Sequence, residues 1–183
     1  TEKMILTRFI EILLEKKVLP IVLGGDHTLT FPTVRAYKKL IHVIQLDAHM
    51  DYSDPTEGMK YVNSTSFRLL HKLENVKSLT QIGIRSMRDE KSNVDDARTN
   101  GSNIISVSKA RKQGIESLLN GLSKGEDCYL SIDVDAYDLS SSSSYKSSKS
   151  SPSSRREITT TTTTRIAMTP TRIIKTCTRI SRF

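Results

Sequence analysis

The feature that most constrains this chain is the regular alternation, up to residue 138, of two kinds of segment. Short apolar runs rich in β-branched residues are followed by longer mixed segments whose apolar residues recur three or four positions apart. Runs of the first kind are typical of buried parallel strands, and segments of the second kind are typical of the helices that connect them. The alternation therefore predicts an α/β fold built on a parallel sheet.

The pattern also places the individual elements. Strands are expected at 18–23, 41–46, 79–84, 103–107 and 127–132. Helices are expected at 2–16, 28–39, 64–73, 90–100 and 109–122. Asn100-Gly101 predicts a helix end, because glycine tolerates the left-handed conformation found there, and Ser108 is the expected N-cap of the following helix.

The sequence changes character after Asp138. About half of residues 139–183 are Ser or Thr, with no apolar period, so this tail cannot bury enough surface to offset the entropy of ordering it. The tail also carries nine Lys or Arg against one acid, Glu157, which accounts for the whole net charge of +8. We expect a globular domain at 1–138, neutral overall, and a disordered low-complexity tail at 139–183. The abrupt change is typical of a reading-frame shift, a hypothesis that sequencing the transcript would test.

Composition limits the environment of the chain. No apolar run approaches the length of a membrane span, the N-terminus lacks a signal-peptide pattern, and Cys128 and Cys177 are the only cysteines. A soluble protein of a reducing compartment, the cytoplasm, is expected. Because the basic charge is dispersed through the tail with few aromatic residues, no specific nucleic-acid partner and no membrane partner are expected.

Three clusters of acidic residues and histidines follow three of the expected strands. They are Gly-Gly-Asp-His at 24–27, Asp-Ala-His-Met-Asp at 47–51 and Asp-Val-Asp at 133–135. The carboxyl ends of parallel strands meet at one edge of a sheet, and side chains two positions apart in an extended segment point the same way. Asp residues commonly lie at strand ends in a purely structural role. Three clusters of Asp and His on one edge instead indicate a functional site. Carboxylates mixed with imidazoles suit a first-row divalent metal, and this number of ligands favours two ions.

The same clusters resemble the metal motifs of the ureohydrolase family, which includes arginase, agmatinase and formimidoylglutamase. The motifs are Gly-Gly-Asp-His-Thr at 24–28, Asp-Ala-His-Met-Asp at 47–51 and Ser-Ile-Asp-Val-Asp-Ala-Tyr-Asp at 131–138. Phe67-Arg68 and Gln-Ile-Gly-Ile-Arg at 81–85 resemble the intervening family sequence. The resemblance implies a three-layer α/β/α fold of the arginase/deacetylase type, present here incompletely, in a catalytic domain at 1–138.

The resemblance also implies a role for each motif residue. His27, Asp47, Asp51 and Asp133 would hold one manganese ion, and Asp47, His49, Asp133 and Asp135 a second. A hydroxide bridging the two ions would attack the planar carbon of a guanidino or formimino group, and Asp51 would pass a proton to the leaving nitrogen. Asp26 is a candidate for orienting a ligand imidazole. Intact family members commonly form homo-oligomers, whereas the sequence gives no oligomeric state for this chain.

One position departs from the family pattern. Arginases and most agmatinases carry a histidine after the second motif, where this chain has Asn63. An amide can hydrogen-bond a substrate but cannot carry a proton near neutral pH, so Asn63 is either a substrate-binding catalytic residue or the N-cap of the next helix.

The resemblance leaves several functions open. The leading one is agmatinase-like hydrolysis of agmatine to putrescine and urea. The alternatives are formimidoylglutamase activity, arginase activity, and a metal-binding fragment with impaired catalysis.

Overall fold

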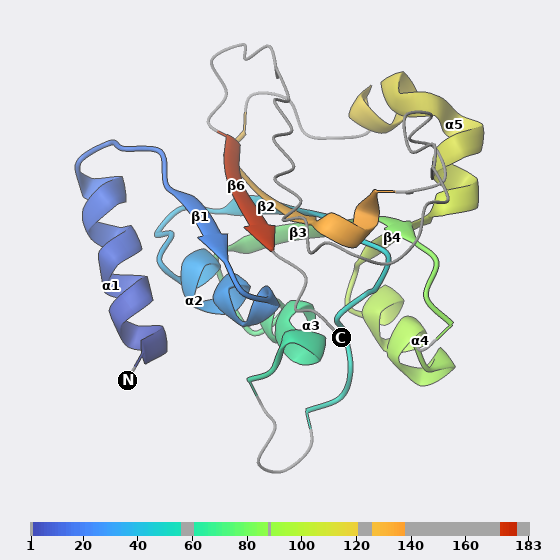
Figure 1. Cartoon of the computed structure of the whole chain (residues 1–183), viewed down its shortest axis with the longest axis horizontal. Coiled ribbons are helices and arrows are strands. Elements are labelled where there is room, and N and C mark those ends of the chain that lie inside the picture. Colours follow the sequence, from blue (N-terminus) through green and yellow to red (C-terminus); the bar gives the residue numbers. More distant parts are fainter. Residues whose placement is uncertain (1, 56–60, 88, 121–125, 138–172, 179–183) are drawn as a thin grey trace, which may run out of the picture.

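The computed structural model describes residues 2–55, 61–87, 89–120, 126–137 and 173–178, and its centre is one sheet of six strands in the order β1-β6-β5-β2-β3-β4 (Figure 1). The strands are β1 (Ile21–Gly24), β2 (Ile41–Leu46), β3 (Val76–Ile84), β4 (Asn103–Ser106), β5 (Cys128–Asp133) and β6 (Ile173–Thr178). All neighbouring pairs are parallel, which confirms the predicted parallel sheet.

Helices cover the sheet on both faces, as the resemblance implied (Figure 1). They are α1 (Glu2–Glu15), η1 (His27–Leu29), α2 (Thr30–Arg35), η2 (Asn63–Thr65), α3 (Ser66–Leu70), α4 (Lys91–Thr99), α5 (Val107–Asn120, interrupted at Gly114) and η3 (Val134–Ala136). In β3, Leu79 belongs to the core under α1 to α4, whereas Thr80 lines a small cavity with Lys109 and Gln113 of α5. Because successive side chains of a strand point to opposite faces, α5 lies on the other side of the sheet. None of the described helices is long and apolar enough to cross a membrane.

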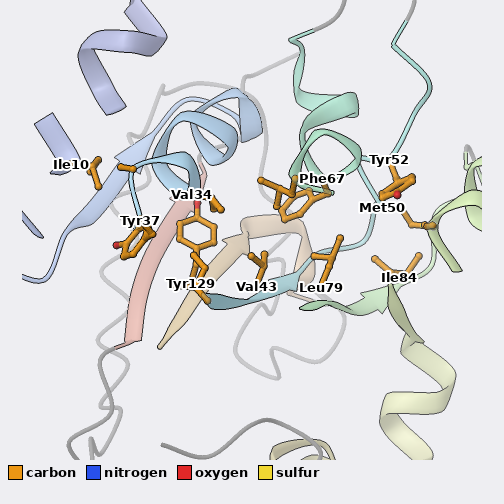
Figure 2. Close-up of a cluster of buried hydrophobic side chains, with 14 residues drawn as sticks. Ile10, Val34, Tyr37, Val43, Met50, Tyr52, Phe67, Leu79, Ile84 and Tyr129 are labelled. Carbon is orange, nitrogen blue, oxygen red and sulfur yellow. The ribbon is translucent and has the colours of Figure 1, made fainter. Parts of the chain in front are cut away.

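A cluster of buried side chains joins the sheet to the helices of one face (Figure 2). Val43 and Tyr129 of adjacent strands are fully buried there beneath Val34 of α2 and Phe67 of α3. Burying a side chain of this kind contributes roughly 1.5–3 kcal/mol. The ring of Phe67 also contacts His27 edge-on, with the ring centroids 5.1 Å apart, so the packing of the core reaches the acidic clusters.

The predicted elements are present, with differences at their ends. β2 covers the predicted residues, β1 starts three residues later than predicted, and β3 starts three residues earlier. The helix predicted at 28–39 ends at Arg35, because the side-chain amide of Asn75 donates to the carbonyl oxygens of Val34 and Tyr37, each at 2.8 Å. A contact from a distant residue therefore ends this helix, which no local pattern indicates.

Two predicted helix ends have different outcomes. α4 stops at Thr99, and Gly101 has a φ of +86°, which confirms the predicted helix end at Asn100-Gly101. The N-cap prediction for Ser108 is wrong. The hydroxyl of Ser106 caps α5 instead, accepting a hydrogen bond from the Lys109 amide at 3.2 Å.

Strand β6 is the main departure from the sequence-based picture. We expected disorder throughout 139–183, and this is wrong for residues 173–178, which lie between β1 and β5 and pair with both. Four of these six residues are β-branched, a local feature that the average composition of the tail conceals. The segment also gains strand partners on two sides, which no local pattern indicates. The rest of the predicted tail, from Leu139 to Arg172 and beyond Thr178, lies outside the described residues. The division into a domain at 1–138 and a tail at 139–183 stays a proposal.

Candidate metal centre

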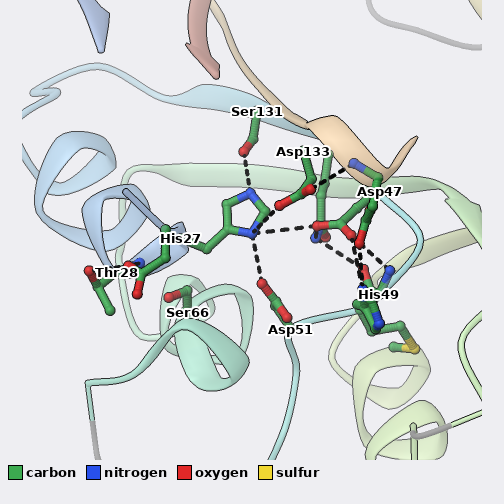
Figure 3. Close-up of polar contacts among 12 residues, drawn as sticks. His27, Thr28, Asp47, His49, Asp51, Ser66, Ser131 and Asp133 are labelled. Atoms are coloured by element: carbon green, nitrogen blue, oxygen red, sulfur yellow. Dashed lines mark hydrogen bonds and ion pairs between the residues drawn. The ribbon is translucent and has the colours of Figure 1, made fainter. Parts of the chain in front are cut away.

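The three acidic clusters meet at one edge of the sheet, beyond the carboxyl ends of β1, β2 and β5 (Figure 3). β2 and β5 are adjacent, so Asp47, which follows β2, and Asp133, the last residue of β5, come from neighbouring strands. β1 is separated from β5 by β6, and η1 carries His27 across this gap to the acids. The predicted convergence of the three clusters on one edge is therefore confirmed in the geometry.

The first group of side chains gathers around His27. Its Nδ1 atom lies 2.7 Å from Asp51 Oδ2, 3.4 Å from Asp47 Oδ2 and 3.9 Å from Asp133 Oδ2. The imidazole of His27 and the carboxylate of Asp47 are both almost fully buried. One ligand atom from each of His27, Asp47 and Asp51 falls within a span of 4.8 Å, which is close enough for one cation.

The second group shares Asp47 with the first. His49 Nδ1 lies 2.9 Å from Asp135 Oδ2 and 3.7 Å from Asp47 Oδ1. Asp47, His49 and Asp135 again offer three ligand atoms within 4.8 Å of one another. Two groups that meet at one carboxylate are the arrangement that a pair of adjacent cations needs. These two groups contain five of the six residues predicted as metal ligands. The sixth, Asp133, belongs to neither group, although its Oδ2 lies 3.9 Å from His27 Nδ1, and the role of all six as ligands stays a prediction.

Negative charge accumulates at this edge. Burial, and next the charge of Asp51, raise the pKa of Asp47 to about 8, although hydrogen bonds from His49 N–H and Gln45 oppose the shift. Burial likewise raises the pKa of Asp133. Burial alone would lower the pKa of His27, but its contact with Asp51 and the charges of Asp51, Asp47 and Asp133 raise it overall. The protein supplies too little positive charge for these carboxylates, and divalent cations would correct the imbalance.

Several residues around the centre were not predicted. Ser131 Oγ lies 3.0 Å from His27 Nε2, and Gln45 Nε2 donates to Asp47 Oδ2 at 2.7 Å. Each precedes a predicted ligand by two positions, so the alternation that grouped the acids also puts Ser131 and Gln45 on the same face. Arg85 donates to the carbonyl oxygen of Asp135. The side chain of Gln81 reaches the segment 47–51 from β3.

Two candidate residues have other positions than expected. The carboxylate of Asp26 accepts from the backbone amide of Thr28 at 2.9 Å and from its hydroxyl, so Asp26 caps η1 and the suggestion that it orients an imidazole is wrong. Asn63 is exposed and is the first residue of η2, whose N-cap is Val62, so the N-cap interpretation of Asn63 is wrong too. The substrate-binding interpretation of Asn63 stays a prediction.

Comparison with known proteins agrees with the fold and the motifs. The Arginase family model matches residues 4–145. Guanidinobutyrase of Pseudomonas aeruginosa is 31% identical over 129 residues, which are 66% of this chain and 40% of the relative. Mitochondrial arginase 1 of Arabidopsis thaliana is 33% identical over 73% of this chain and 40% of its own length.

Solved structures give the same result. Formimidoylglutamase from Bacillus subtilis superposes with a TM-score of 0.66 at 28% identity, covering 74% of this chain and 46% of the other. Agmatine ureohydrolase of Thermoplasma volcanium gives 0.64 at 26% identity, covering 72% and 44%. The chain spans about 40% of the length of the curated relatives named above. Because the family model matches most of this chain's residues and these solved structures share its fold, the chain belongs to the Arginase family.

Proposed function

We propose that this chain binds two manganese ions at the sheet edge where β1, β2 and β5 end. We propose further that it hydrolyses the C–N bond of a linear guanidino or formimino compound. The observation that carries the proposal is the pair of ligand groups that share Asp47. The proposed ligands are His27, Asp47, Asp51 and Asp133 for one ion, and Asp47, His49, Asp133 and Asp135 for the other. Carboxylate oxygens with one imidazole at each ion suit manganese.

The cations, when bound, lower the pKa of a water molecule so that it becomes a nucleophile near neutral pH. The chain's own residues provide the rest. Buried Asp47 fixes the spacing of the two groups because it belongs to both. Asp51, which is partly accessible, is placed beside His27 Nδ1 and can accept a proton and pass it to the leaving nitrogen. Ser131 contacts the other ring nitrogen of His27 and holds the imidazole in its orientation.

The substrate class follows from the relatives. Guanidinobutyrase, arginase, formimidoylglutamase and agmatinase match this chain at 31% to 36% identity, so similarity alone does not rank their substrates. We propose agmatine as the first substrate, with formimidoylglutamate and arginine as alternatives. Asn63 supplies an amide that hydrogen-bonds the substrate, without proton transfer. A cytoplasmic location belongs to the same proposal.

Metal content and turnover measured on one preparation test the proposal. The protein is purified with manganese and assayed with agmatine, arginine, 4-guanidinobutyrate and formimidoylglutamate, while urea and formamide are both scored. We expect two manganese ions per chain and hydrolysis of one substrate. Asp47→Asn should lose both ions and turnover, whereas Asp95→Asn, which changes an exposed carboxylate on α4, should keep them. Bound manganese without turnover would indicate a metal-binding fragment, and absence of bound manganese would refute the metal centre.

A further inference from the structure

Two glutamines are buried side by side beneath the candidate metal centre. Gln45 of β2 and Gln81 of β3 are directly opposite each other in the register of the two strands, and both are fully buried. Burying a primary amide costs free energy unless its hydrogen-bonding groups find partners. The partners of these two amides therefore indicate what the buried pair does.

The donors of both amides are used. Gln81 Nε2 donates to Gln45 Oε1 and to the carbonyl oxygen of Met50, both at 2.6 Å. Gln45 Nε2 donates to Asp47 Oδ2 at 2.7 Å and to the carbonyl oxygen of His49 at 3.1 Å. The orientation of each amide is fixed, because exchanging its oxygen and nitrogen would place oxygen against two acceptors. Gln81 Oε1 has no partner among the described residues, so the pair gives up one hydrogen bond to make these four.

The contacts converge on the segment from Asp47 to Asp51. Gln45 and Gln81 bind the carbonyl oxygens of His49 and Met50, and the Phe67 amide donates to the carbonyl oxygen of Asp51 at 3.1 Å. Asp51 has a φ of +47°, a conformation that costs a non-glycine residue free energy and persists only where its surroundings impose it. The segment is therefore held from the sheet side, by the two amides, and from α3.

We propose that Gln45 and Gln81 are positioning residues that set the geometry of the metal centre, and that Gln45 acts through the Asp47 carboxylate that both ligand groups share. This positioning role rests on the proposed function, because the two amides can set the geometry of a metal centre only if cations bind there. Gln45 donates to Asp47 Oδ2, the carboxylate oxygen that lies 3.4 Å from His27 Nδ1, and to the carbonyl oxygen of His49 in the other group. Gln81 acts only through Gln45 and the carbonyl oxygen of Met50. Removing the Gln45 amide should therefore weaken manganese binding at both groups, and by more than removing the Gln81 amide.

The test compares three glutamine-to-methionine substitutions, because methionine has similar length and lacks the amide. Gln45→Met and Gln81→Met remove the buried donors, and Gln113→Met changes an exposed glutamine on α5 as the matched control. Manganese affinity and stoichiometry are measured on the full chain, with electron paramagnetic resonance to distinguish one isolated ion from two coupled ions. Circular dichroism and thermal melts of the metal-free proteins report folding separately.

We expect Gln45→Met to bind manganese about 10- to 100-fold more weakly than the unsubstituted protein. At manganese concentrations that fill the unsubstituted protein, this variant should show the spectrum of an isolated ion. In excess manganese it should show the coupled pair again. Gln81→Met should lose less affinity, and Gln113→Met should lose none. Affinity within twofold of the unsubstituted chain for both buried variants would overturn the inference. If Gln45→Met does not fold, Gln81→Met decides the question, and if neither folds the amides serve the fold and the inference is wrong. An unsubstituted chain that binds no manganese would refute the proposed function itself.

Discussion

The pKa shifts at Asp47, Asp133 and His27 are all upward, and they make stability depend on pH in one direction. Between its usual value of 3.8 and the value of about 8 in the folded chain, Asp47 keeps a proton that the unfolded chain has lost. The folded state then binds more protons than the unfolded state, so stability falls as pH rises through this window. The raised pKa of His27 acts with the same sign, because its contribution is lost as pH rises through the folded value.

We therefore expect metal-free protein to melt at a lower temperature at about pH 8 than at about pH 5, with part of the difference removed in Asp47→Asn. Manganese should reverse the trend, because its ligands must be deprotonated and its affinity rises with pH. Thermal melts in chelator and in manganese across this range provide the measurement, with Asp95→Asn as a control. A metal-free melting temperature that rises with pH would contradict the assignment of a raised pKa to Asp47.

The backbone of Asp51 gives a second prediction for a single residue. Its φ of +47° lies in the left-handed region, which asparagine and aspartate tolerate better than other side chains with a Cβ atom. Metal-free Asp51→Ala should therefore be less stable than Asp51→Asn by about 1 kcal/mol, and both should lose turnover. Urea unfolding in chelator measures the difference. Equal stability of the two variants would show that the left-handed backbone at Asp51 costs little.

Among the elements, β3 contacts the metal centre through a glycine that lies against the backbone of Asp47. Gly83 has a φ of +98°, and a Cβ atom there would lie 3.0 Å from the carbonyl oxygen of Asp47. Gly83→Ala should cost about 1–2 kcal/mol of stability and also displace Asp47, so that manganese binds more weakly. Gly101→Ala is the matched control, because Gly101 has a φ of +86° but no neighbouring atom within 4 Å.

The comparison of these two variants separates backbone strain from displacement of the ligand. Both should melt at a lower temperature, but only Gly83→Ala should lose manganese affinity in a titration. If Gly101→Ala loses as much affinity as Gly83→Ala, the effect is a general loss of stability, and the close approach of β3 to Asp47 is not its cause.

The elements also show how far the sequence predicts this structure. β2 was predicted to the residue, because its run of mainly apolar residues stops at Asp47 and alternate residues of the strand are buried. The ligand clusters were predicted because position in a strand determines direction, and the same rule applied to Gln45 and Ser131 finds their side chains. The end of α2 was not predictable, since Asn75 acts from 38 residues beyond Tyr37. The environment of Asn63 was not predictable either, since its position depends on how η2 begins.

At the scale of the whole molecule, β6 decides whether the candidate metal centre is held together. Among the described strands, β1 pairs with β6 alone, and β6 pairs on its other side with β5, so β6 connects the strand before His27 to the strand that ends at Asp133. The register places Thr176 opposite Val22 of β1 and Ser131 of β5. If residues 173–178 had no structure, substitutions in them would leave the metal centre unaffected. If they form β6, such substitutions should disturb the metal centre.

Proline at position 176 tests this connection, because proline has no amide hydrogen to donate and is poorly accommodated inside a sheet. Thr176→Pro should destabilise the chain by about 1–3 kcal/mol, because a backbone acceptor loses its donor. It should weaken manganese binding most at the group that contains His27. Thr162→Pro, outside the described residues, makes the same change within the run of threonines and is the control. Thermal melts, hydrogen exchange of β1 amides and manganese titration report the outcome. If Thr176→Pro behaves like Thr162→Pro, residues 139–183 are a dispensable tail as the composition suggested, and β1 must be held to the sheet by its helix contacts alone.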